Sequence, residues 1–262
     1  LNKRKVFSGT LGDYTLYSFN IMKNISGLYG GGISCNDLNF SKFNMNLQSS
    51  LKSFPNFLYI KQNLIFLILK IFSLNFFYNN FFFYIIKYAH LKKRKYLLNL
   101  FYPSLRFKKK KKFPKKYFSS IHNFSKKIVF LQLRNFTRRE RNHFERKQKN
   151  KYYLKSFNKM KLKQISLLKI VDFNYQNFLD FPILVENKEL LNNYLLKKGF
   201  EIKYLHYKNC SRTFNINYKK NKNSELFEKK IICLPSHSKI NKKYIDNILY
   251  TINQFYLYLE KN

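Results

Sequence analysis

Lys23 stands between two short apolar runs, and Gly30-Gly31-Gly32 follows it seven residues later. A lysine at the junction of a strand and a turn can present its amine to a bound cofactor, and such amines bond readily to carbonyl carbons. Ser18, five residues before Lys23, could contact a phosphate through its hydroxyl. The glycines would let the backbone approach a bulky group with no Cβ in the way. A lysine-based cofactor site is therefore one interpretation of this stretch.

The composition offers a simpler interpretation of any single lysine. Lys and Arg make up 51 of the 262 residues, so a given lysine is by default a solvated surface group. The net charge of +38 would also fit a nucleic-acid or membrane partner. The chain is rich in Lys, Asn, Ile, Phe and Tyr and poor in Ala, Gly and Pro, as an AT-rich coding sequence would produce. We therefore attribute much of the charge to composition and expect no specific nucleic-acid partner.

The three cysteines, Cys35, Cys210 and Cys233, have unrelated spacings and form no CxxC pair. This pattern supports neither a disulfide framework nor a zinc site. We find no secretory signal peptide. The expected location is the reducing cytoplasm, with peripheral contact at the inner face of a membrane left open.

A longer pattern surrounds the lysine: Gly9-x-x-Gly12-Asp13-x-x-x-Tyr17-Ser18-Phe19-x-x-x-Lys23, then Gly30-Gly31, then Asn36-Asp37. It resembles the cofactor-lysine segment of the DegT/DnrJ/StrS family of pyridoxal-phosphate-dependent sugar aminotransferases. Near the other end, the resemblance extends to Phe181–Val185, Leu190–Gly199, His206-Tyr207 and Ile232–Pro235, which are similar to the small domain of that family. Between them, Gln132-Leu133 and Arg146–Tyr153 are loosely similar to a helix of the family.

The resemblance implies an α/β fold, the C-terminal portion of a fold-type-I pyridoxal-phosphate transferase. It implies that Lys23 is the catalytic residue and holds pyridoxal 5'-phosphate, with Ser18 and Asn20 as further cofactor contacts. Tyr29 and His206 are the expected substrate contacts. The complete protein would transfer an amino group, expected from glutamate, to a nucleotide-linked keto-sugar for cell-surface polysaccharide synthesis, and it would be a homodimer.

The chain departs from the family pattern at several positions. Asn20 replaces a frequent His, Tyr29 replaces a Glu, and Phe118-Ser119-Ser120 stands where an N-x-R or N-x-K segment is expected. The family's carboxylate for the pyridine nitrogen lies about thirty residues before the lysine, whereas only 22 residues precede Lys23 here. We therefore expect a portion of a longer protein that is inactive alone. The alternative is a catalytically silent, membrane-associated or basic binding protein that keeps the transaminase scaffold.

We expect the chain to consist of four segments. Residues 1–53 would end the large cofactor-binding domain, 54–118 would be an apolar and then basic insertion, 119–179 a long basic helix with a connector, and 180–262 a small α+β domain. In the first segment, residues 13–19 and 32–35 are predicted strands. In the last, we expect strands over 181–185, 201–205 and 230–234, a helix capped by Asn187 and ended by Gly199, and a final amphipathic helix.

For two of these segments, the sequence allows more than one binding partner or environment. Leu64–Leu69 and Phe81–Ile86 are continuous apolar runs, shorter than the roughly 18–20 residues of a membrane span. Because Lys92-Lys93-Arg94-Lys95 and Lys108–Lys112 follow, residues 57–90 could lie on an anionic membrane or form a buried hairpin. Residues 119–157 read as one polar helix carrying Arg138, Arg139, Arg141 and Arg146. We favour a solvated face over RNA binding for this helix.

Overall fold

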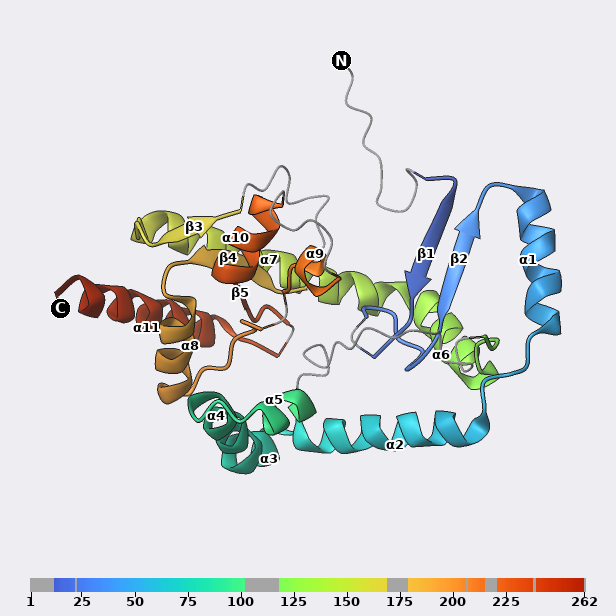
Figure 1. Ribbon diagram of the computed structural model, residues 1–262, viewed down its shortest axis with the longest axis horizontal. Helices are drawn as coiled ribbons and strands as arrows, with labels where there is room; N and C mark the ends of the chain where they lie inside the picture. Colours follow the sequence, from blue (N-terminus) through green and yellow to red (C-terminus); the bar gives the residue numbers. More distant parts are fainter. Residues whose placement is uncertain are drawn as a thin grey trace, which may run out of the picture. The chain divides into compact units, whose positions relative to one another are not determined.

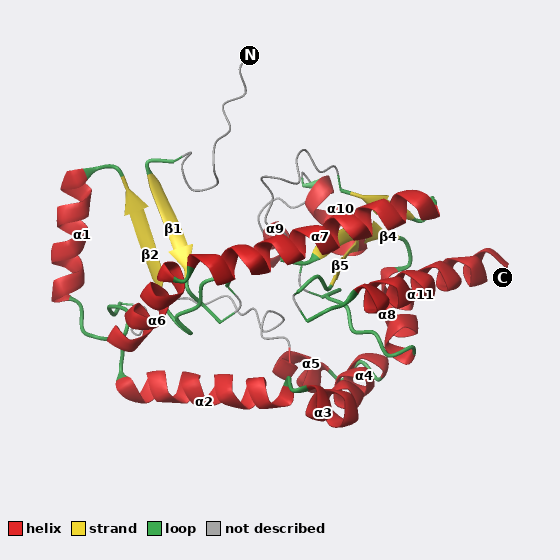
Figure 2. Ribbon diagram, turned by 180° about the vertical axis from the view of Figure 1, so that it is seen from behind, coloured by secondary structure: helices red, strands yellow, loops and turns green. Residues whose placement is uncertain are grey.

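The computed structural model describes residues 12–21, 23–101, 118–168, 179–205, 207–214, 221–237 and 239–261 (Figure 1). The chain divides into two compact units. Unit 1 comprises Leu1–Tyr78 and Lys110–Arg139, and unit 2 comprises Asn79–Lys109 and Glu140–Asn262. Helices and strands are both present in each unit (Figure 2), and the expected α/β class is confirmed.

Unit 1 begins with an antiparallel hairpin of β1 (Tyr14–Ser18) and β2 (Gly31–Cys35), in which Ser18 lies opposite Gly31. Both strands were predicted from the sequence. Helix α1 (Leu38–Ser50) follows β2, and the Asp37 carboxylate caps it by accepting hydrogen bonds from the backbone N–H groups of Asn39 and Phe40, at 2.8 and 3.2 Å. This cap satisfies two donors that a helix start otherwise leaves unpaired.

The apolar stretch after α1 is helical. It contains α2 (Asn56–Phe72), α3 (Asn75–Phe77), the π-helical turn η1 (Tyr78–Phe82), α4 (Phe83–Leu91) and α5 (Lys95–Phe101). Among the described residues, no single helix has the length and apolar composition of a membrane span, although Asn56–Phe72 and Asn75–Leu91 meet both criteria together as a sharply bent pair.

The expectation of one helix over residues 119–157 is wrong. Two helices occupy this stretch, α6 (Asn123–Arg134) and α7 (Phe136–Met160). They are separated by Asn135, whose backbone leaves the helical region at φ −86° and ψ 64°. Asparagine is a weak helix former and is common at helix ends, so the break has a local cause. The side chains of Arg138, Arg139 and Arg141 lie outside the described residues.

Unit 2 contains an antiparallel sheet in the order β3-β4-β5, built from β3 (Ile165–Leu167), β4 (Phe181–Val185) and β5 (Ile231–Leu234). Helices α8 (Lys188–Lys197), α9 (Cys210–Thr213), α10 (Lys222–Lys230) and α11 (Lys242–Lys261) complete the unit. The strands β4 and β5 were predicted and β3 was not, because three residues give too short a pattern.

Two local expectations for unit 2 need correction. Residues 201–205 form no strand; only an isolated bridge joins Lys203 to Cys233. Asn187 precedes α8 in a left-handed conformation, with φ 54°, and its side chain makes no capping bond. Asparagine tolerates this conformation better than most residues, so here it shapes a turn instead of capping the helix. Gly199, at φ 92°, follows the end of α8 as expected.

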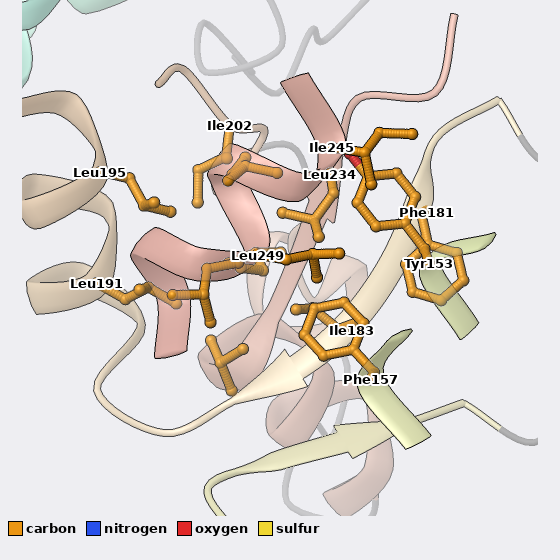
Figure 3. Close-up of a cluster of buried hydrophobic side chains, with 14 of the residues drawn as sticks. Tyr153, Phe157, Phe181, Ile183, Leu191, Leu195, Ile202, Leu234, Ile245 and Leu249 are labelled. Carbon is orange, nitrogen blue, oxygen red and sulfur yellow. The ribbon is translucent and has the colours of Figure 1, made fainter. Parts of the chain in front are cut away.

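The core of unit 2 lies between the sheet, α7, α8 and α11 (Figure 3). Tyr153 and Phe157 of α7 stack on Phe181 of β4, with ring centroids 5.1 and 6.1 Å apart. The predicted stripe of α11 enters this core and is buried, apart from the half-buried Leu259: Ile245, Ile248, Leu249, Ile252, Phe255, Tyr256 and Leu259. One face of helix α11 packs against the sheet, and this accounts for the amphipathic sequence of the helix.

Two leucines of α8 test this core directly. Leu195 is fully buried, whereas Leu190 is 54% exposed. We expect Leu195→Ala to lower the free energy of unfolding of unit 2 by about 3 kcal/mol, because it removes buried methyl groups and leaves a cavity. Leu190→Ala should cost less than about 0.5 kcal/mol. Urea titration followed by far-ultraviolet circular dichroism measures both, and equal losses would contradict the assigned packing.

Unit 2 also contains a buried histidine. His90 of α4 is 4% exposed, and its Nδ1 lies 3.3 Å from the Tyr204 hydroxyl. Burial lowers the pKa of His90 to about 4. The unfolded chain, with a pKa near 6.5, binds the proton first as pH falls. We expect unit 2 to lose stability from about pH 6.5 toward pH 4, and His90→Gln to flatten this dependence. Burial also lowers the pKa of His237, which would leave a residual slope.

Candidate functional site

The lysine predicted to carry the chemistry lies in a closed loop between β1 and β2. The Phe19 N–H donates to the Gly30 carbonyl and the Gly27 N–H donates to the Phe19 carbonyl, both at 2.9 Å. A tighter turn forms inside the loop, where the Lys23 N–H donates to the Asn20 carbonyl at 2.9 Å. The Lys23 side chain is exposed. The loop backbone is therefore fixed at both ends while the amine is accessible.

Helix α6 holds this loop through one side chain. The Gln132 Nε2 donates to the Ser26 carbonyl at 2.6 Å, and the Ser26 N–H donates to Gln132 Oε1 at 3.1 Å. One amide thus satisfies both main-chain groups of Ser26. The adjacent Gly27 is buried so closely on α6 that an added Cβ would lie 2.9 Å from a methyl carbon of Val129. The loop therefore packs tightly against α6.

The glycine run has a different role from the one expected. Gly30 adopts φ 105°, and a Cβ there would lie 2.5 Å from Cδ1 of Ile121. A Cβ on Gly32 would lie 3.3 Å from the Phe19 ring. The close approach predicted at these glycines is therefore made by side chains of the protein itself.

Three of the predicted site residues lie within a short exposed stretch at one end of the hairpin. Ser18 ends β1, Asn20 begins the loop, and Lys23 is at its turn; all three are exposed. The Asn20 Oδ1 accepts a hydrogen bond from the Ile21 N–H at 2.6 Å, which leaves its amide nitrogen for another partner. An amine, a hydroxyl and an amide thus lie within six residues at one end of the hairpin.

Of the two residues predicted to contact substrate, Tyr29 and His206, the structure describes only Tyr29. The Tyr29 ring is half-buried and lies against Phe54, with ring centroids 4.3 Å apart. His206 falls outside the described residues. The backbone of Ser120, in the segment that departs from the family pattern, donates to the Lys52 carbonyl at 3.0 Å and accepts from the Phe54 N–H at 3.2 Å.

These residues fit part of a site for a cofactor that carries an aldehyde and a phosphate. Lys23 offers the amine, and Ser18 offers a donor for a phosphate oxygen. Asp37, the carboxylate after β2, is engaged in capping α1, so the described loop and α6 offer no carboxylate for a pyridine nitrogen. Among the described residues, no three His, Cys, Asp or Glu side chains gather as a metal ion would require.

The role of Gln132 was missed by reasoning from the sequence. The dipeptide Gln132-Leu133 is loosely similar to part of a family helix, and that similarity assigns no function to Gln132. A glutamine in an amphipathic helix gives no local sign that it will bond to a main-chain group 106 residues away. Only the tertiary structure identifies it as a residue that positions the lysine loop.

Comparisons with known proteins place the fold. No family model and no curated protein matches the sequence. Solved structures do match: the aminotransferase TlmJ of Streptoalloteichus hindustanus has a TM-score of 0.60 at 12% identity and covers 96% of this chain and 54% of its own. A DegT DnrJ EryC1 StrS aminotransferase of Brucella abortus has a TM-score of 0.51 at 13% identity. The match covers 93% of this chain and 51% of the Brucella protein.

A third match is the E. coli GDP-4-keto-6-deoxy-D-mannose-3-dehydratase with bound hydrated PLP, with a TM-score of 0.57 at 13% identity, covering 95% of this chain and 56% of its own. The chain thus spans about half the length of the solved proteins that it matches. At these identities the likeness establishes the fold, and it confirms that the chain has part of the fold of these transferases.

Gln132 can be tested without any ligand. We expect Gln132→Ala to speed amide hydrogen exchange at Ser26 and Gly27 by about tenfold or more, because both main-chain groups of Ser26 lose their partner. Gln48→Ala, which shortens an exposed glutamine of α1 in the same unit, should leave these rates unchanged. If exchange at Ser26 is the same in both variants, Gln132 does not hold the loop.

Proposed function

We propose that this chain is the C-terminal portion of a pyridoxal-phosphate-dependent aminotransferase and that Lys23 is its catalytic residue. The observation that carries the proposal is the exposed amine of Lys23 on a loop fixed by β1, β2 and Gln132. The fold shared with several aminotransferases supports it. A reactive amine requires a rigid backbone and an accessible side chain, and this loop provides both.

The residues of the loop have separate tasks in this proposal. Lys23 binds the cofactor through its amine and, once displaced by substrate, moves a proton at the substrate carbon. Ser18 and Asn20 orient the cofactor by hydrogen bonding. When bound, the cofactor supplies an electron sink for the carbon that loses its proton. The carboxylate for the pyridine nitrogen would come from outside the described residues.

The substrates follow from the family resemblance and not from contacts in the structure. We propose that the complete protein takes an amino group from glutamate and passes it to a nucleotide-linked keto-sugar that serves polysaccharide synthesis. Tyr29 and His206 remain the proposed substrate contacts, and a homodimer remains the proposed assembly. Because the chain spans about half of its structural relatives, we propose that it is inactive alone.

We propose a reducing cytoplasmic location, in agreement with the free thiols of Cys35, Cys210 and Cys233. A specific nucleic-acid partner is not proposed. Contact with an anionic membrane surface is also proposed. The second candidate, a silent protein on the same scaffold, is favoured by Asn20 and Tyr29, which depart from the family pattern.

Reductive labelling tests the role of Lys23. In the complete protein, we expect substoichiometric pyridoxal phosphate, followed by borohydride and peptide mapping, to label Lys23 ahead of the other lysines, because its backbone is fixed and its amine accessible. This chain alone should bind the cofactor weakly or not at all. The unreduced complex of the complete protein should absorb near about 410–430 nm. Lys23→Arg should remove the preferred label.

Lys42→Arg, which changes an exposed lysine of α1, is the matched control and should keep the preferred label on Lys23. A label spread evenly over the exposed lysines would mean that the loop holds no cofactor site, and the silent scaffold would then be the better description.

A further inference from the structure

Helix α2 carries a largely apolar face outward, bordered by Lys61. The exposed residues Phe57, Ile60, Leu64, Leu67, Ile68 and Ile71 recur at spacings of three and four, so they share one side of the helix, here called the outer face of α2. Leu64 and Leu67, at its centre, are 56% and 52% exposed. A surface helix of a globular protein normally shows polar residues on this side, so the outer face of α2 requires an explanation.

The opposite side of α2 is the one that contacts the protein. Tyr59 is buried there, and its ring stacks on His122 with centroids 4.0 Å apart. The Asn56 amide oxygen lies 3.1 Å from Nε2 of the same histidine. These contacts fix the rotation of α2 within unit 1. Turning the apolar side inward would break them, so the outward direction is a built feature of the helix.

The charge around α2 indicates what could cover it. No Asp or Glu occurs between Asp37 and Glu140, whereas 22 Lys and Arg residues occur in that stretch. A second copy of the chain would bring an equally acid-free, cationic segment to the interface, and like charges would repel. An anionic lipid surface combines an apolar layer with negative headgroups, and so matches both properties.

We propose that the outer face of α2 docks on an anionic membrane surface, with the helix lying in the plane of the headgroups. The 17 residues of α2 rise about 26 Å, less than the roughly 30 Å of a bilayer core. Lys61 and Lys70 interrupt the apolar sequence of the helix and can extend their amines toward the headgroups.

The chain contains no tryptophan, so a single introduced one reports on its site alone. In Leu67→Trp we expect a blue shift of emission on adding vesicles of phosphatidylglycerol and phosphatidylcholine, and no shift with phosphatidylcholine alone. Leu131→Trp, at a position of α6 that is also exposed, is the matched control and should not shift. A shift at both positions, or at neither, would overturn the proposal.

Vesicle flotation tests the apolar contribution. We expect Leu64→Gln with Leu67→Gln to weaken binding to the anionic vesicles at least about tenfold, since two leucines no longer enter the lipid. Phe130→Gln with Leu131→Gln alters two exposed residues of α6 and should have little effect. If the α2 variant instead abolishes a dimer seen by light scattering without lipid, the outer face is a self-association surface and the proposal fails.

The charge contribution is tested against a control of equal net charge. Lys61→Gln with Lys70→Gln should reduce anionic-vesicle binding by about fivefold per lysine, while Lys126→Gln with Lys127→Gln, two exposed lysines of α6 in the same unit, should reduce it less. Wild-type binding should fall when salt is raised from about 50 to 500 mM. Equal losses in the two variants, or binding indifferent to salt and lipid charge, would overturn in-plane docking on an anionic surface.

Discussion

The pairing of Gln132 with Ser26 is the constraint on which the candidate site depends. A loop of this length between two short strands has many conformations, and fixing each residue has an entropic cost. The Gln132 side chain satisfies both main-chain groups of Ser26, and Gly27 and Gly30 allow the loop to contact Val129 and Ile121 closely. The position of the Lys23 amine is thus set by residues around position 130, far along the chain.

The two units are supported in different ways. Unit 2 has a closed core of aromatic and aliphatic side chains between its sheet and three helices. In the part of unit 1 that the structure describes, the sheet has two strands, and Leu16 of β1 is 80% exposed. An isolated hairpin is marginally stable in water. A chain that spans about half of its structural relatives would leave such a sheet incomplete, which agrees with a site that needs further residues.

The positive charges are neutralised by acidic side chains to different extents along the chain. In unit 2, Lys203 pairs with Asp180 at 2.6 Å and Lys229 with Glu225 at 3.2 Å, so some of its cations are neutralised locally. Between Asp37 and Glu140 the sequence contains no acidic residue, although Lys93 in this stretch pairs with Glu189 at 2.7 Å. Compositional drift explains an excess of lysine, but it does not explain why the apolar side of α2 points outward, where Tyr59 and His122 hold it.

The fold class was implied by the resemblance of closely spaced motif residues to a known family. The sequence by itself determined the strands around Lys23, the strand Phe181–Val185 and the stripe of α11, because each rests on local periodicity. It placed Ser18, Asn20 and Lys23 together for the same reason. Only the tertiary structure decided the break at Asn135, the role of Gln132, the partners of the glycines and the direction of α2. Those depend on contacts between residues distant in sequence, and no local pattern encodes which side chain will fill a given space.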